Sequence, residues 1–206
     1  MLTFDGAIAG MGTSSGTRLV VGMWPLSPYG SVTDVMIERP DGHRILLAPT
    51  RELADFIAAT YVFDEIRITP VLRVRDGKKW MVSTAELALT FDVGRRTLLG
   101  LALLATPRPL ARARWWTTLQ DPIARVVMGG VRTRGTAGGG RREWYSAQDI
   151  HRIRSVSARL DGVELGELRP VTPPVHFGFA STPEEPSLVR VLTSISGAPA
   201  EDAEAR

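Results

Sequence analysis

The sequence predicts a mainly β protein of the α+β class, either an antiparallel β-barrel or a two-sheet sandwich built of hairpins. Extended runs rich in β-branched residues recur along the chain, and Asp-Gly turn signals interrupt them at residues 41–42, 76–77 and 161–162. Helical spacing of apolar residues is scarce: it indicates one amphipathic helix and a short helical insert in the middle. This pattern favours hairpins over a doubly wound parallel sheet.

The first stretch with special chemistry is GMGTSSGTR, Gly10 to Arg18. A phosphate-binding loop requires a strand before it and a helix after it, because backbone N–H groups and the helix dipole hold the anion together. After Gly16 the chain reads TRLVVGMW, which has no helical spacing and no Lys-Ser or Lys-Thr pair. We therefore expect a hairpin turn here, with Gly10, Gly12 and Gly16 supplying the backbone freedom of the turn.

The next elements follow in order from their turn and cap signals. Residues 31–49 alternate about Pro40-Asp41-Gly42, which predicts a hairpin. Thr50 is the expected N-cap of a helix over 51–61, whose apolar residues fall on one face. A second hairpin is expected over 66–93, turning at Asp76-Gly77, and Pro70 indicates an edge or a bend.

From Gly94 to Gly130 the pattern becomes helical and basic, and two short helices are expected. Strands are then expected in EWYSA, in the segment around Asp161-Gly162, in VHFGFAS and in SLVRVLTSI. We expect one β-rich domain over 1–196, with the insert at about 94–130, and a disordered tail over 197–206.

Composition removes several classes of chemistry. The 206 residues include no cysteine, so neither a disulfide nor a thiol nucleophile is available. The three histidines lack the spacing of metal ligands, so we expect no metal. Lys78 and Lys79, adjacent in a predicted turn, are the only lysines and are poor Schiff-base candidates. No cofactor is expected, no signal peptide or membrane span is indicated, and a cytoplasmic location is the default.

Charge is unevenly distributed along the chain. Residues 95–154 hold twelve arginines but only three acidic residues, within a chain of net charge +3. The candidate surface for an anionic partner comprises Arg108, Arg112, Arg114, Trp115, Trp116, Arg132 and Arg134. A solvated or self-paired face is the favoured interpretation. Peripheral contact with an anionic membrane is an alternative, whereas nucleic-acid binding is disfavoured because no known module accompanies the arginines.

A small-molecule site is the main functional expectation. Its candidate residues are Trp24, Tyr29, Asp34, Trp80, Trp144 and His176. Asp34 lies in the middle of a predicted strand among apolar neighbours, which raises a carboxyl pKa. His176 alternates with Val175 and Phe177, so it either lines a barrel interior or faces solvent.

The tripeptide Gly22-Met23-Trp24 resembles the Gly-x-Trp motif of lipocalin-like barrels, which bind small apolar ligands. The resemblance covers three residues, and here they stand at the end of the second predicted strand. We expect non-catalytic binding of an apolar or amphipathic small molecule, including an anionic one, by such a barrel. The alternative is an enzyme with Asp34 and His176 as an acid–base pair in the barrel cleft. The oligomeric state is left open.

Overall fold

The computed structural model describes residues 2–105, 134–136, 142–178 and 182–196. Within these ranges the chain forms two helices and thirteen strands. The first elements are β1 (Leu2–Thr13), β2 (Arg18–Leu26), β3 (Val32–Glu38), β4 (Arg44–Ala48), α1 (Arg51–Ala58), β5 (Glu65–Ile68), β6 (Leu72–Asp76), β7 (Lys79–Ser83) and β8 (Leu87–Arg96). They are followed by α2 (Leu98–Ala105), β9 (Arg134–Thr136), β10 (Arg142–Leu160), β11 (Val163–Glu164), β12 (Leu168–Arg169) and β13 (Ser187–Ser196).

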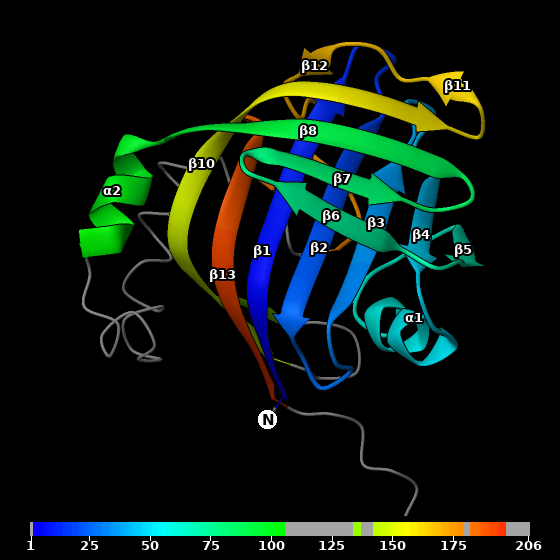
Figure 1. The fold of residues 1–206 in the computed structure, drawn as a ribbon. Coiled ribbons are helices and arrows are strands. Elements are labelled where there is room, and N and C mark those ends of the chain that lie inside the picture. Colours follow the sequence, from blue (N-terminus) through cyan, green and yellow to red (C-terminus); the bar gives the residue numbers. More distant parts are fainter. Residues whose placement is uncertain (1, 106–133, 137–141, 179–181, 197–206) are drawn as a thin grey trace, which may run out of the picture.

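The described strands form one strongly curled sheet, a half-barrel (Figure 1). Its order is β5-β4-β3-β2-β1-β13-β10-β8-β7-β6, and the short strands β9, β11 and β12 pair outside this path. All described pairs are antiparallel except β4–β5, which is parallel because α1 makes the crossover between the two strands. The predicted fold class, mainly β with an amphipathic helix, is confirmed.

The concave side of the half-barrel holds the main core. Strands β1 to β4 present alternate residues to this side, for example Met11, Leu19 and Ile37, because side chains on a strand alternate between its two faces. Across the interior, Leu89 and Phe91 of β8 pack against them. Side chains therefore hold the two arms of the sheet together, as in small filled barrels.

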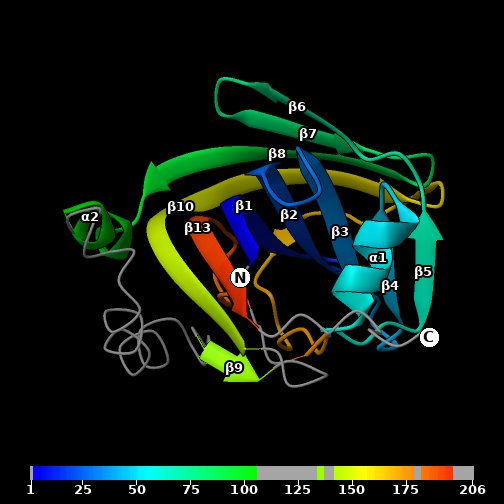
Figure 2. The ribbon, with the colours of Figure 1, turned by 90° about the horizontal axis from the view of Figure 1, so that it is seen from below.

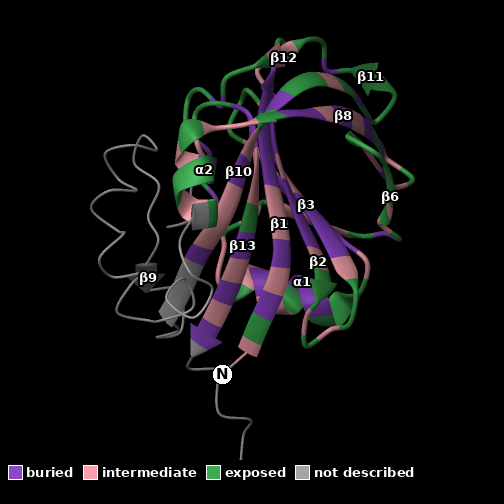
Figure 3. Cartoon of the chain, turned by 60° about the vertical axis from the view of Figure 1, so that its left-hand side comes forward, coloured by how far each residue is buried: buried purple, intermediate pink, exposed green. Residues whose placement is uncertain are grey.

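The convex side of β1 to β4 is also covered. Thr50 caps α1 as predicted: its hydroxyl oxygen accepts a hydrogen bond from the Leu53 N–H at 3.2 Å. Leu53 and Ile57 of this helix are buried against β4, and α1 lies beside β4 and β5 in Figure 2. The irregular segment 171–178 covers the remainder through Val175 and Phe177. Burial on both sides makes these strands the purple centre of Figure 3.

The hairpin expected at residues 10–18 is present, but its glycines differ from the prediction. Gly16 has a φ of +84° in the turn, as expected. Gly10 and Gly12 instead lie inside β1, where a Cβ on Gly12 would meet the carbonyl oxygen of Pro170. They are glycines because other chain segments approach the strand closely, and not because the turn requires them.

Other boundaries also differ from the sequence-based expectations. Residues 65–76 form two strands, β5 and β6, on either side of Pro70. Residues 142–160 form a single strand, β10, where we expected two. Residues 175–178 are buried at alternate positions but form no strand: the His176 N–H donates to the Glu38 side chain, and the Phe177 carbonyl oxygen accepts from the Val62 N–H. The first expected insert helix is α2, and the second lies outside the described residues. No described helix combines the length and apolar character that crossing a bilayer requires.

Candidate functional site

A cleft of about 380 Å³ opens at one end of the half-barrel. Three segments meet there. The first is the turn between β2 and β3 together with the start of β3, the second is the pair of residues before α1, and the third is β6 together with the residue before it. The lining residues are Tyr29, Ser31, Val32, Thr33, Pro49, Thr50, Val71 and Arg73. Strand pairing holds β3 and β6 in place, and the Thr50 cap holds the segment before α1.

Strand β6 has an inverted pattern of polar and apolar residues. Arg73 is paired with the buried Val82, and Arg75 with Trp80, so both arginines point to the concave side. Leu72 and Val74 point the other way, and they are 65% and 55% exposed. A strand that covers a core ordinarily directs its apolar residues inward. The inversion places cationic side chains at the mouth of the half-barrel.

Arg73 differs from Arg75, the other inward-pointing arginine of β6, in the contacts of its guanidinium. Among the described residues the Arg73 guanidinium makes no ion pair and no hydrogen bond, and partial burial lowers its pKa from the usual range. Arg75, by contrast, donates from Nε to the Gly77 carbonyl oxygen at 3.0 Å and lies 5.0 Å from the Trp80 ring centre. Arg73 therefore brings five N–H donors to the cleft without a protein acceptor within the described chain.

Polar and aromatic groups complete the cleft. The N-terminus of α1, with Thr50 at its cap, is part of the wall, and a helix N-terminus favours negative charge. Tyr29 contributes an aromatic edge whose position is set by packing: its ring centre lies 5.3 Å from that of Phe56 and 6.2 Å from that of Phe4. Val32 and Val71 add apolar surface. The lining thus suits a molecule with one anionic and one apolar part.

A second hollow, with a larger volume of about 640 Å³, lies on the other side of the β2–β3 turn. Its lining residues are Thr3, Asp5, Pro25, Leu26, Ser27, Pro28, Gly30, Ser31 and Leu192. Ser31 lines both hollows, so they are adjacent. We call the first hollow the Arg73 cleft and the second the Leu26 groove.

Three of the six predicted ligand residues gather near one another. Trp24, Tyr29 and Asp34 belong to an aromatic cluster between the convex face of the sheet and α1, in which Phe4 contacts the rings of Trp24 and Tyr29. Asp34 is 3% exposed and accepts a hydrogen bond from the Trp24 indole N–H at 3.1 Å. Burial raises the pKa of Asp34 to about 7. Of the three, Tyr29 lines the Arg73 cleft.

His176 is held elsewhere on the convex face. Its backbone N–H donates to Glu38 at 2.6 Å, and its Nδ1 lies 3.1 Å from the same carboxyl group. Glu38 also pairs with the buried Arg18 at 3.1 Å. Asp34 and Glu38 are four residues apart on β3, about 13 Å along a strand. The contacts of His176 and Asp34 are therefore separate, and the 67% exposed His176 ring tethers segment 171–178 to the sheet.

The remaining predicted residues are dispersed. Trp80 stacks on Phe91 in the β7–β8 arm, with ring centres 6.3 Å apart. Trp144 of β10 is paired in register with Arg134 of β9. The other members of the basic surface, Arg108, Arg112, Arg114, Trp115, Trp116 and Arg132, lie outside the described residues, so an anionic partner for them stays a prediction.

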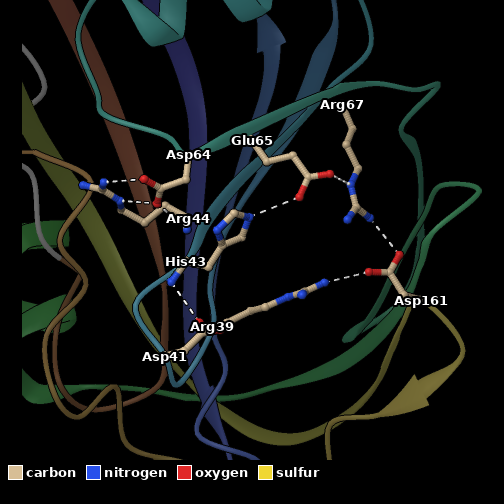
Figure 4. A network of polar contacts seen from close by, with 8 residues as sticks. All are labelled: Arg39, Asp41, His43, Arg44, Asp64, Glu65, Arg67 and Asp161. Carbon is tan, nitrogen blue, oxygen red and sulfur yellow. Dashed lines mark hydrogen bonds and ion pairs between the residues drawn. The ribbon is translucent and has the colours of Figure 1, made fainter.

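A network of polar contacts joins distant turns at another end of the molecule (Figure 4). Asp161, in the turn between β10 and β11, accepts from Arg39 at 2.8 Å and from Arg67 of β5 at 2.7 Å. Arg67 also pairs with Glu65, which lies 3.2 Å from His43. Asp161 and Glu65 each have a basic partner in this chain of contacts, which indicates a structural tie rather than a vacant site.

Sequence reasoning missed Arg73 and Thr50 as site residues. The available signal was the alternation in LRVRD, but the sequence does not say which face of that strand covers the core. A strand with arginines on one face is normally assumed to direct them to solvent.

Comparisons with known proteins add little. No protein-family model matches the sequence, and no curated protein matches it. Among solved structures, an acetoacetate decarboxylase from Legionella pneumophila is similar with a TM-score of 0.40 and 7% sequence identity, over 93% of this chain and 83% of that chain. A likeness this remote carries no information about activity.

Proposed function

We propose that this protein binds a small amphipathic molecule through an anionic group, without catalysis, in the Arg73 cleft. The observation that carries the proposal is the partly buried guanidinium of Arg73, which has no counter-charge among the described residues and lines a cleft with apolar and hydroxyl-bearing walls. A cation that is partly removed from water gains more from an anion than an exposed one does.

A carboxylate or phosphate group matches this arrangement chemically. The planar guanidinium can donate two parallel hydrogen bonds to such a group, and a hydrogen bond to a charged partner contributes about 1.5–3 kcal/mol. The N-terminus of α1 adds a favourable dipole on the same wall. The rest of the ligand would contact Tyr29, Val32 and Val71, whose apolar surface favours a hydrocarbon part.

A competing explanation is that the inward arginines only protect an open sheet edge. Strand β6 is one end of the sheet, and inward-pointing charges are a known device against edge-to-edge association. The two explanations differ in what Arg73→Glu should do. Protection of the edge needs a charge of either sign, so Arg73→Glu should stay monodisperse under both explanations. Anion binding needs a positive charge, so under our proposal the same variant should also lose the ligand.

The test compares Arg73→Gln with Arg75→Gln, a control on the same strand and the same face but outside the cleft lining. Binding of butyrate and octanoate is measured by titration calorimetry at low salt, together with native mass spectrometry of the purified protein. We expect Arg73→Gln to weaken carboxylate binding at least tenfold and Arg75→Gln to change it less than twofold. Equal affinities in wild type and Arg73→Gln would contradict the proposal.

A further inference from the structure

We infer that the ligand is an elongated anion with an alkyl chain, whose charged group lies at Arg73 and whose chain continues past Ser31 into the Leu26 groove. This inference rests on the proposed function and extends it to the class of ligand. It is carried by the position of the second hollow and by the chemistry of its walls.

The walls of the Leu26 groove are apolar where a chain would lie. Pro25, Leu26, Pro28 and Leu192 contribute to the lining, and Leu26 is 68% exposed. A leucine this exposed beside a hollow leaves hydrocarbon surface in water that a ligand can cover. The two prolines restrict the backbone, so little conformational entropy is lost when the groove is filled.

The two hollows are separated by a turn that holds its own shape. The Ser27 hydroxyl donates to the Gly30 carbonyl oxygen at 2.7 Å, and the Gly30 N–H donates to the Ser27 carbonyl oxygen at 3.1 Å. Gly30 has a φ of +80°, which glycine adopts without strain. A ligand that contacts Ser31 on both sides therefore lies against a fixed edge, and the hollows act as two parts of one site.

Charge sets the direction of the ligand. Asp5 is the one charged residue among those that line the Leu26 groove, and it already pairs with Arg190 at 3.0 Å. The groove therefore offers no cation to a second anionic group, whereas the Arg73 cleft does. The anionic end of the ligand therefore lies at Arg73, and its alkyl end lies in the Leu26 groove.

The test is a series of linear carboxylates from acetate to dodecanoate, titrated against wild type, Leu26→Gln and Leu72→Gln. Leu72 is a matched control because it is a similarly exposed leucine that lines neither hollow. For wild type and Leu72→Gln we expect affinity to rise up to about fourfold per methylene over the longer members of the series. For Leu26→Gln we expect dodecanoate to lose at least tenfold more affinity than butyrate.

The outcomes separate this inference from the proposed function. If butyrate binds in an Arg73-dependent way and lengthening the chain gains nothing, the anion site stands and the alkyl-chain ligand is wrong. If chain length matters equally in wild type and Leu26→Gln, the chain does not lie in the groove, and the inference is again wrong. If no carboxylate of any length binds at low salt, the proposed function itself fails.

Discussion

Asp34 carries a carboxyl group whose pKa burial raises to about 7, so that about half of it stays protonated at neutral pH. It accepts a hydrogen bond from the Trp24 indole N–H, and no cation of the described chain pairs with it. Gly22 stands beside it on β2, where a Cβ would come within 2.5 Å of an Asp34 carboxyl oxygen. The fold therefore makes room for this group while leaving it without a counter-charge, which is costly once it ionises.

The sign of the resulting pH dependence follows from the raised pKa. The folded protein holds the Asp34 proton up to a pH of about 7, whereas the unfolded chain releases it near 3.8. Folding stability from this group is therefore present below pH 3.8 and falls as pH rises to about 7. We expect Asp34→Asn to remove this fall and to raise the free energy of unfolding at pH 8 by about 2–4 kcal/mol.

Urea unfolding at pH 4.5, 6 and 8 measures this effect, with the exposed Asp55→Asn on α1 as the control. An unchanged pH profile in Asp34→Asn would mean that water or a rearrangement solvates the carboxylate. Tyr29 lines the Arg73 cleft and also contacts Phe4 of the same cluster, so the titrations of the Arg73 cleft should be made at one fixed pH.

Strand β1 shows where local pattern and long-range packing conflict. We expect Gly12→Ala to destabilise the fold by about 1–3 kcal/mol, because the new methyl group would meet the carbonyl oxygen of Pro170, the residue after β12. Thermal unfolding checks this result, and Ser15→Ala, which removes the hydrogen bond from the Thr17 N–H within the turn, distinguishes it from a loss of turn geometry. Saturable ATP binding that disappears in Gly12→Ala, with stability unchanged, would instead support a phosphate loop.

Local signals in the sequence predicted much of the element structure. The turns at Gly42, Gly77 and Gly162 all have positive φ as their Asp-Gly signals indicate, and the Thr50 cap is in place. Gly10 and Gly12 were misassigned because the segments that approach them lie more than 150 residues away in sequence. Such contacts leave no mark in a local pattern.

The candidate site was predicted less well than the fold. Of the predicted ligand residues, Tyr29 lines the Arg73 cleft and Asp34 lies in the adjoining aromatic cluster, whereas Arg73 does not belong to the predicted set. The reason is physical: alternation gives two faces of β6, and the curl of the whole sheet decides which of them is concave. His176 was likewise placed by its contact with Glu38, which no spacing rule predicts.

The curled sheet as a whole is also tied together by Asp161. Its side chain and those of Arg39 and Arg67 are all at least one fifth exposed, so each ion pair contributes about 0–1 kcal/mol. We expect Asp161→Asn to lower the free energy of unfolding by about 1 kcal/mol or less and to reduce its sensitivity to salt. Asparagine also tolerates the φ of 51° at this position, so the variant removes the charge alone.

Chemical denaturation at 20 and 500 mM NaCl measures the effect of Asp161→Asn. A loss well above 1 kcal/mol would show that the contacts act cooperatively across the three turns. A loss of β5 amide protection in hydrogen exchange, with the other strands unaffected, would place the effect at the edge of the sheet.

The position of β13 has a consequence for biosynthesis. This strand lies between β1 and β10, so the last strand of the described residues joins the first strand to the remaining arm. While a ribosome is still making residues 187–196, β1 and β10 each present an unpaired edge, and neither arm can complete the core they share. The nascent chain therefore stays exposed to aggregation until residues 187–196 have left the exit tunnel, and closure of the half-barrel follows.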